Sequence, residues 1–318
     1  MHLNLFITSL LISILTTYIY KNIWSIVYSK NKVPTGYGLL LILFFYFYSI
    51  YFNNVNSNSV TFSIILFFSI IYWLDDLLHL PFIFRFLLQF ICGCIIAICL
   101  LIYDGYNINY YFYAIVAISG LLNIFLSNVI NFYDGLDLNI SIFTLILGVI
   151  LIYLSDQSII NSEYGYIIIG FILGFSIFNY KPDNIFFGDS GCFVIASFIN
   201  FLFIKSILVL NLNITYMIIP LALPIVDVLY VIMFRIYKKE SLLIRNYHHL
   251  YHQLQSRFNN KIYLIPQIFN ALVLYIISII VIDTTIFDLN QNLIFITLSF
   301  LFTILTYILI KKFIKFKN

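Results

Sequence analysis

Residues 127–140 read SNVINFYDGLDLNI and stand at the seam between two long apolar segments. Asn128, Asn131, Asp134 and Asp137 recur in this stretch at every third position. In one continuous α-helix that ladder would drift by about half a turn, since each residue advances by roughly 100°. We therefore expect the glycine after Asp134 to mark a break, so that the four polar groups line a pocket suited to a cation and a polyphosphate.

The apolar segments on either side belong to a chain of 318 residues that is 63% hydrophobic and 9% charged. Soluble domains contain about 25% charged residues, so this composition indicates a membrane protein. No Pro-rich or Gly-rich linker divides the chain, and we expect a single transmembrane domain over residues 1–318. The expected fold is all-α and polytopic with about eleven transmembrane helices, at 3–20, 38–52, 60–74, 82–103, 111–130, 140–154, 164–180, 192–210, 215–235, 262–282 and 293–310.

Basic residues separate the loops between these segments into two classes. The loops on one side, together with the C-terminal tail, contain nearly all Lys and Arg residues, and the opposite loops contain none. By the positive-inside rule the basic side is cytoplasmic, the N-terminus is outside and the C-terminus is inside. This charge suits anionic lipid headgroups of the bilayer and does not indicate a nucleic-acid partner. The predicted inner loops are 21–37, 75–85, 128–139, 181–191 and 236–261.

The first two inner loops carry candidate chemistry. Loop 21–37 ends in KNKVPTGYG, in which Lys32 precedes a proline and two glycines. This pattern is either a turn with snorkelling lysines or a flexible clamp on a phosphate-bearing substrate. Asp75 and Asp76 are adjacent carboxylates at the end of an apolar run, where they repel each other unless a cation is near. They predict a magnesium or general-base site, the alternative being an interfacial pair that faces water.

The last two inner loops add a glycine-flanked acid and a histidine cluster. In the sequence Gly188-Asp189-Ser190-Gly191, Asp189 or Ser190 can cap the following helix, and the glycines let backbone N–H groups approach a ligand. Histidines beside a phosphate fit the last loop better than a zinc site, because no cysteine or third fixed ligand accompanies them. The residues of that cluster are His248, His249, His252 and Arg245.

Taken in this order, the motifs resemble those of the polyprenyl-phosphate N-acetylhexosamine-1-phosphate transferases, glycosyltransferase family 4. That family includes the undecaprenyl-phosphate GlcNAc-1-phosphate transferases and the phospho-MurNAc-pentapeptide translocase. The resemblance extends over nearly the whole chain, since the span count and the order of the inner loops agree. The sequence departs in three places: at Leu138, where the family usually has glycine, at Tyr251, where many members have histidine, and in the PTGYG loop, which has fewer glycines than usual.

The resemblance implies a magnesium-dependent phosphoglycosyltransferase. Such an enzyme moves an N-acetylhexosamine-1-phosphate from a UDP-sugar to polyprenyl (undecaprenyl) phosphate, releases UMP and initiates synthesis of a cell-surface glycan, as in cell wall or lipopolysaccharide biogenesis. It is a multi-pass protein of the bacterial inner membrane with its active site facing the cytoplasm. Whether it forms a homodimer stays open.

The same resemblance implies roles for individual residues. Mg²⁺, or Mn²⁺ in its place, would be held by Asp189 and Asn131. The catalytic residues would be Asp75, Asp76, Asp134, Asp137, His249 and His252. The substrates would be bound by Lys32, Asn128, Asn131, Arg245 and His248.

Two other classes of protein stay open at this point. The first is a proton- or ion-coupled transporter, because acids inside membrane helices often mark ion pathways. Against it, the acids gather at one membrane face, Asp227 alone comes close to mid-bilayer, and no internal repeat of the kind seen in many transporters is present. The second is a catalytically degenerate family member, given Leu138 and Tyr251.

Overall fold

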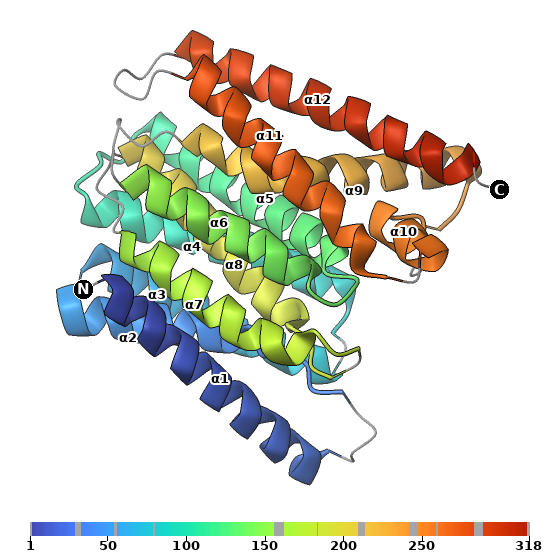
Figure 1. The fold of residues 1–318 in the computed structure, drawn as a ribbon. Coiled ribbons are helices and arrows are strands. Elements are labelled where there is room, and N and C mark those ends of the chain that lie inside the picture. Colours follow the sequence, from blue (N-terminus) through green and yellow to red (C-terminus); the bar gives the residue numbers. More distant parts are fainter. Residues whose placement is uncertain are drawn as a thin grey trace. The chain divides into compact units, whose positions relative to one another are not determined.

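The computed structural model shows a helical protein. Every regular element in the part of the chain that it describes is a helix, and nine of these helices are long and apolar enough to cross a membrane (Figure 1). The all-helical, polytopic membrane architecture expected from composition is therefore confirmed. Which side each terminus faces stays a prediction. The described residues are 2–28, 33–53, 56–78, 80–155, 162–182, 184–208, 214–241, 247–258, 260–282 and 289–316.

All eleven predicted segments form helices, but two of them are shorter than a full span. α2 (Leu39–Asn53) has 15 residues and α6 (Asn139–Ser155) has 17, whereas a bilayer core needs about 20. α3 (Ser57–Leu78), which we expected to be short, extends to 22 residues. Within the described ranges, the structure thus supports nine candidate spans and two shorter apolar helices where about eleven spans were expected.

The chain divides into two compact units, Met1–Ile214 and Thr215–Asn318, here called unit 1 and unit 2. The single domain over residues 1–318 stays a prediction. Besides α2, α3 and α6, unit 1 contains α1 (His2–Val27), α4 (Phe82–Tyr103), α5 (Tyr110–Tyr133), α7 (Ser162–Asn179) and α8 (Gly188–Leu208). Unit 2 contains α9 (Ile218–Lys238), α10 (Leu250–Phe258), α11 (Ile265–Val281) and α12 (Leu289–Phe316).

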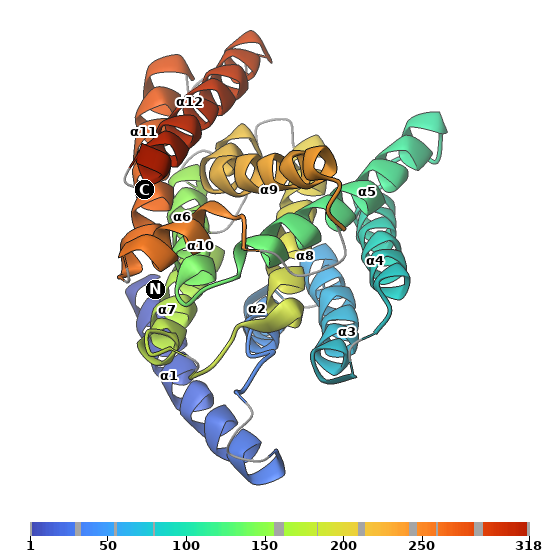
Figure 2. The ribbon, with the colours of Figure 1, turned by 90° about the vertical axis from the view of Figure 1, so that its right-hand side faces the viewer.

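α8 forms the centre of unit 1, where it packs against α2, α3, α4 and α5 (Figure 2). The Ser197 hydroxyl donates to Asn123 Oδ1 at 3.1 Å, and Asn200 Nδ2 donates to Ser119 Oγ at 3.0 Å. Inside a bilayer polar groups must find partners within the protein, because lipid offers none. These bonds fix the rotation of α8 against α5, and with it the direction in which the α8 N-terminus points.

The polar stretch around residues 128–139 is broken where the sequence predicts. α5 ends at Tyr133 and α6 begins at Asn139, with residues 134–138 between them. Leu138 has a φ of 63°, and its carbonyl accepts the N–H of Ile142 at 2.9 Å, so it starts α6. A left-handed backbone costs an L-residue about 1–2 kcal/mol. Leucine therefore stands at a position that favours glycine.

In unit 2, α9 carries Pro224 in its interior. Proline has no N–H to offer the carbonyl of residue 220, one turn earlier. Gln267 of α11 donates its Nε2 to that carbonyl at 2.9 Å, which ties α11 to α9 at the break. Almost one turn after Pro224, Asp227 is buried, with 1% of its surface exposed.

Candidate active site

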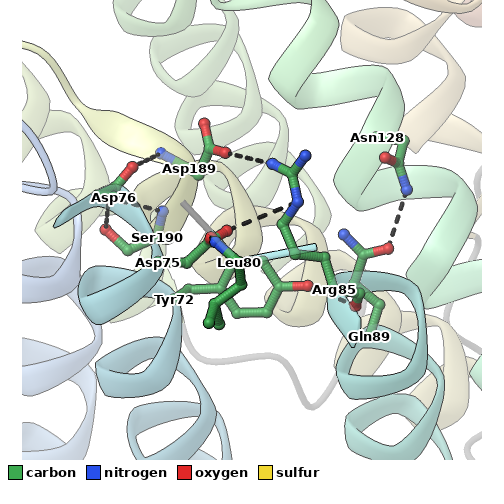
Figure 3. Close-up of polar contacts among 9 residues, drawn as sticks. All are labelled: Tyr72, Asp75, Asp76, Leu80, Arg85, Gln89, Asn128, Asp189 and Ser190. Atoms are coloured by element: carbon green, nitrogen blue, oxygen red, sulfur yellow. Dashed lines mark hydrogen bonds and ion pairs between the residues drawn. The ribbon is translucent and has the colours of Figure 1, made fainter. Parts of the chain in front are cut away.

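Carboxyl groups meet at one end of unit 1, where α3 and α5 end and α8 begins. We call Asp75, Asp76, Asp134 and Asp189 the acidic cluster. The charges of Asp76 and Asp189 act on Asp134, and the charge of Asp75 acts on Asp189. Figure 3 shows three of these acids, with the guanidinium of Arg85 reaching towards Asp75 and Asp189. Acids separated by more than a hundred positions in the sequence thus lie together.

Asp76 caps the N-terminus of α8. Its Oδ1 accepts the N–H of Asp189 at 2.9 Å, and its Oδ2 accepts the N–H and the hydroxyl of Ser190 at 3.3 and 3.0 Å (Figure 3). A helix N-terminus carries unsatisfied N–H groups and favours negative charge. From the sequence, Asp189 or Ser190 can cap this helix. In the structure an acid from α3 accepts the hydrogen bonds of both residues instead.

The loop with the sequence PTGYG packs directly on this cap. Pro34 accepts the N–H of Phe186 at 2.8 Å, and Gly38 donates its N–H to Phe187 at 3.0 Å. Gly188 has a φ of +86°, and a Cβ there would lie 2.4 Å from Gly36 N and 2.7 Å from Asp76 Oδ2. Only a glycine fits this crossing, so the motifs around residues 36 and 188 form one structure. Lys32, predicted to bind substrate from this loop, lies outside the described residues.

Asp75 and Arg85 link α3 to α4 and to α8. Asp75 is 3% exposed, its Oδ1 accepts the N–H of Leu80 at 2.6 Å, and its Oδ2 lies 3.7 Å from Arg85 Nε. Arg85 Nη1 lies 3.1 Å from Asp189 Oδ2, and Tyr72 donates its hydroxyl to the Arg85 carbonyl at 2.7 Å. Arg85 was not predicted as a site residue. The signal was present, because it is the only Lys or Arg between Lys32 and Lys181.

Asp134 lies directly after α5, half-buried among the other acids. Burial raises its pKa to about 7, and the negative charges of Asp189, Asp76 and Asp137 add to this rise. A hydrogen bond from the Cys192 thiol, at 3.6 Å, opposes the rise. Asp137, which is half-buried in the same loop, thus belongs to the surroundings of the acidic cluster.

Three asparagines near the cluster have different surroundings. Asn131 lies within hydrogen-bonding reach of the Asp189 carboxylate. Asn128 donates Nδ2 to Gln89 Oε1 at 2.9 Å, on the far side of Arg85 from Asp76 (Figure 3). Its role in substrate binding stays a prediction.

Asn179 is the third, and sequence reasoning missed it. Its Oδ1 accepts the N–H of Leu138 at 2.7 Å, and its Nδ2 donates to the carbonyl of Ile185 at 2.8 Å. Asn179 is buried at the end of α7. It therefore fastens the loop of Asp134 and Asp137 to the segment that precedes Gly188.

The histidines lie in unit 2. His249 is buried, its Nδ1 is 2.8 Å from Asp227 Oδ2, and its ring stacks on Tyr251. His252 packs against Tyr247 and Tyr251. His248 Nε2 lies 3.1 Å from Glu240 Oε2. Arg245, predicted beside them, lies outside the described residues.

The acidic cluster fits a magnesium ion shared with a substrate. In the described ranges no three His, Cys, Asp or Glu side chains are placed to hold a metal ion by themselves. Magnesium commonly uses one or two carboxylates together with substrate phosphates. Asp189 and Asn131 offer oxygen donors, the Asp189 side chain is 31% exposed, and Arg85 already places a positive group at this carboxylate.

Comparison with known proteins relates the region of the acidic cluster to one family. Residues 57–207, which carry the whole acidic cluster and Arg85, match the model of Glycosyl transferase family 4. Over this region, just under half of the chain, the protein is similar to glycosyl transferase family 4. It is also 30% identical over 188 residues to a protein of Bacillus subtilis (strain 168) described as a probable undecaprenyl-phosphate N-acetylglucosaminyl 1-phosphate transferase. That match covers 55% of this chain and 50% of the relative, so the chain spans about half the length of the curated relative it matches.

The family resemblance read from the motifs is confirmed, over a shorter region than expected. The sequence motifs suggested a likeness over nearly the whole chain, whereas the glycosyl transferase family 4 model stops at residue 207. The loop before Gly38 and the histidine loop lie outside the region that matches this family.

Proposed function

We propose that this protein transfers an N-acetylhexosamine-1-phosphate from a UDP-sugar to polyprenyl phosphate, giving the lipid-linked diphosphate sugar and UMP. The observation that supports this most is the convergence of the acidic cluster with Arg85 at the ends of α3, α5 and α8. The finer points of the proposal are undecaprenyl phosphate as the acceptor, magnesium dependence, and a site facing the cytoplasm of a bacterial inner membrane.

The chemistry explains why such a site is needed. The reaction brings two phosphate-bearing anions together, so charge is its main obstacle, and positioning and electrostatic stabilisation dominate phosphoryl transfer. Bound magnesium would neutralise the diphosphate. Asp189 and Asn131 would hold the metal. Arg85 orients the Asp189 carboxylate, with its Nη1 3.1 Å from Asp189 Oδ2.

The two acids of α3 have different surroundings. Asp76 positions the α8 N-terminus through three hydrogen bonds. Asp75 is the candidate for orienting the lipid phosphate or taking its remaining proton. Like Asp189, it lies beside the guanidinium of Arg85. Little proton transfer is required, because a phosphomonoester has a second pKa of about 6 and is mostly ionised at neutral pH.

The remaining residues of the predicted inner loops are proposed to bind the donor substrate. Asp134 and Asp137 would contact the nucleotide side of the donor. His248, His249 and His252, with Arg245 and Lys32, would hold the sugar phosphate or diphosphate. The name of the Bacillus relative makes UDP-GlcNAc the first donor to test.

The test is a transfer assay with the purified full-length protein in sealed liposomes that contain undecaprenyl phosphate. Radiolabelled UDP-GlcNAc, UDP-GalNAc and other UDP-N-acetylhexosamines are supplied in turn, with magnesium. We expect label in the extracted lipid and an equal amount of released UMP. The Asp189→Asn variant, with the same shape and one charge less, should lose almost all transfer while still being inserted.

Two results would contradict the proposal. Label that accumulates inside the vesicles, without a lipid-linked product, would indicate a transporter. A folded protein that transfers none of the sugars would indicate a degenerate family member. Full activity in EDTA would remove magnesium from the proposal, and wild-type activity in Asp189→Asn would remove the metal assignment.

A further inference from the structure

Unit 2 contains a buried carboxylate that the proposed mechanism does not use. Asp227 lies in the interior of α9 and is 1% exposed. Its Oδ1 accepts the N–H of Leu250 at 2.9 Å and the hydroxyl of Tyr307 at 2.8 Å. Its Oδ2 lies 2.8 Å from Nδ1 of His249. A charged residue inside a membrane helix is costly, so its retention with this set of partners calls for a role.

These contacts favour Nδ1 as the ring nitrogen of His249 that carries the proton. The N–H of Leu250 and the O–H of Tyr307 can only donate here, so Asp227 acts as an acceptor, as an ionised carboxylate does. The remaining oxygen then accepts from Nδ1–H of His249. In the neutral ring, a proton on Nδ1 makes Nε2 the acceptor nitrogen.

The surroundings hold the ring as well as its proton. The ring of His249 stacks on Tyr251 with centroids 5.3 Å apart and planes at 11°. His249 also stands at the start of α10, where its carbonyl accepts the N–H of Gln253 at 3.2 Å. Tyr251, one of the departures from the family pattern, thus supports a neighbouring histidine.

We propose that Asp227 is a positioning residue for His249. Its carboxylate fixes the orientation and the Nδ1–H form of the ring, so that Nε2 is the nitrogen that accepts the proton of a P–OH group of the substrate and then donates a hydrogen bond to the resulting phosphate oxygen. Tyr307 of α12 and the start of α10 hold the carboxylate in turn. The inference rests on the proposed function for its substrate, and the arrangement of the pair itself can be measured without any activity.

Asparagine at position 227 gives a sharp test, because it has the same shape as aspartate. Leu250 and Tyr307 both require an acceptor, so they keep the amide oxygen and turn the NH₂ group towards His249. That NH₂ group can only donate, so Nδ1 must become the acceptor and the proton moves to Nε2. A change of one atom therefore reverses the tautomer.

The first measurement is NMR of the full-length protein labelled with ¹⁵N-histidine in lipid nanodiscs. The chain has five histidines, so few ring signals arise, and His249→Gln assigns those of His249. We expect a protonated Nδ1 and an unprotonated Nε2 in the neutral ring of the wild type, and the reverse in Asp227→Asn. A wild-type ring protonated at Nε2 would overturn the proposal. This part of the test uses the wild type and therefore holds even if Asp227→Asn does not fold.

The second measurement is a double-mutant cycle on sugar-phosphate transfer. We expect Asp227→Asn to lower kcat by about 100-fold or more, the range of effects for a group that orients or moves a proton. Asp227→Glu should recover part of this loss. Because Asp227 acts through His249, the double variant Asp227→Asn/His249→Gln should match His249→Gln alone within about threefold.

A structural role alone would give a different pattern. The two losses would then multiply in the double variant, and that result would overturn the proposal. Asp104→Asn, which removes an ion pair with Lys205 in unit 1, serves as the independent control and should combine multiplicatively with His249→Gln. If the Nδ1–H tautomer is found but no transfer occurs, the pairing stands and the proposed function fails.

Discussion

Replacing Asp76 by asparagine tests whether a carboxylate holds the N-terminus of α8. Asp76 accepts two hydrogen bonds from Ser190 on one oxygen and one from Asp189 on the other. Asparagine keeps one carbonyl oxygen and carries an NH₂ group in place of the second, which cannot accept. Either the Ser190 donors or the N–H of Asp189 must therefore lose a partner.

The size of the effect follows from these contacts. A hydrogen bond to a charged group contributes about 1.5–3 kcal/mol, and the negative charge at the helix N-terminus adds about 0.3–1 kcal/mol. Removing one carboxylate charge also relieves repulsion with Asp189, which offsets part of this loss. We expect a net decrease of about 2 kcal/mol in the free energy of unfolding, or a Tm lower by roughly 4–8 °C.

Thermal unfolding with a thiol-reactive dye measures this change, because the four cysteines lie in α4 and α8 and react when those helices open. Ser190→Ala is the matched control, since it removes the hydroxyl donor alone and should cost only about 1 kcal/mol. An unchanged Tm in Asp76→Asn, or a larger drop in Ser190→Ala than in Asp76→Asn, would refute the cap. Both variants should be compared at one scan rate.

Three further predictions concern the surroundings of the acidic cluster. Leu138→Gly should raise the Tm by about 2 °C without loss of transfer, because it relieves a left-handed leucine, whereas the β-branched Leu138→Val should lower it; a Val variant more stable than the Gly variant would contradict this. Asn179→Leu should destabilise by roughly 2–6 kcal/mol, since it leaves a buried N–H and the carbonyl of Ile185 without partners; wild-type melting would show that this amide fastens nothing. Arg85→Lys should lower transfer at least about tenfold at unchanged insertion, because an ammonium group cannot reproduce the fork that reaches two carboxylates; full activity would mean that only its charge matters.

Local patterns predicted much of this molecule. Apolar runs indicated the helices, because a bilayer demands long apolar segments whatever their neighbours are. The glycine after Asp134 indicated the break between α5 and α6 correctly. The bounds of α2 and α6 were predicted to within one residue. The length of α3 was predicted poorly, because polar residues at helix ends can continue a helix when other helices cover them.

Partners that are distant in sequence were not predictable in the same way. Nothing near Asp76 in the sequence shows that it caps a helix beginning at Gly188, more than a hundred positions later. The role of Asn179 is equally invisible, because a single amide after an apolar run is ordinary. Asp227 was noticed for its depth in an apolar segment, but its meaning depends on His249 and Tyr307, which only the fold brings to it.

Binding of Mn²⁺ tests most directly whether the acids of unit 1 form one metal site with the substrate diphosphate. Electron paramagnetic resonance of the purified protein counts bound Mn²⁺ as UDP-GlcNAc is added, for the wild type and for Asp189→Asn. We predict one tightly bound ion per chain that requires the nucleotide sugar and is lost in the variant. The same number of ions, bound with the same affinity in Asp189→Asn, would contradict the account.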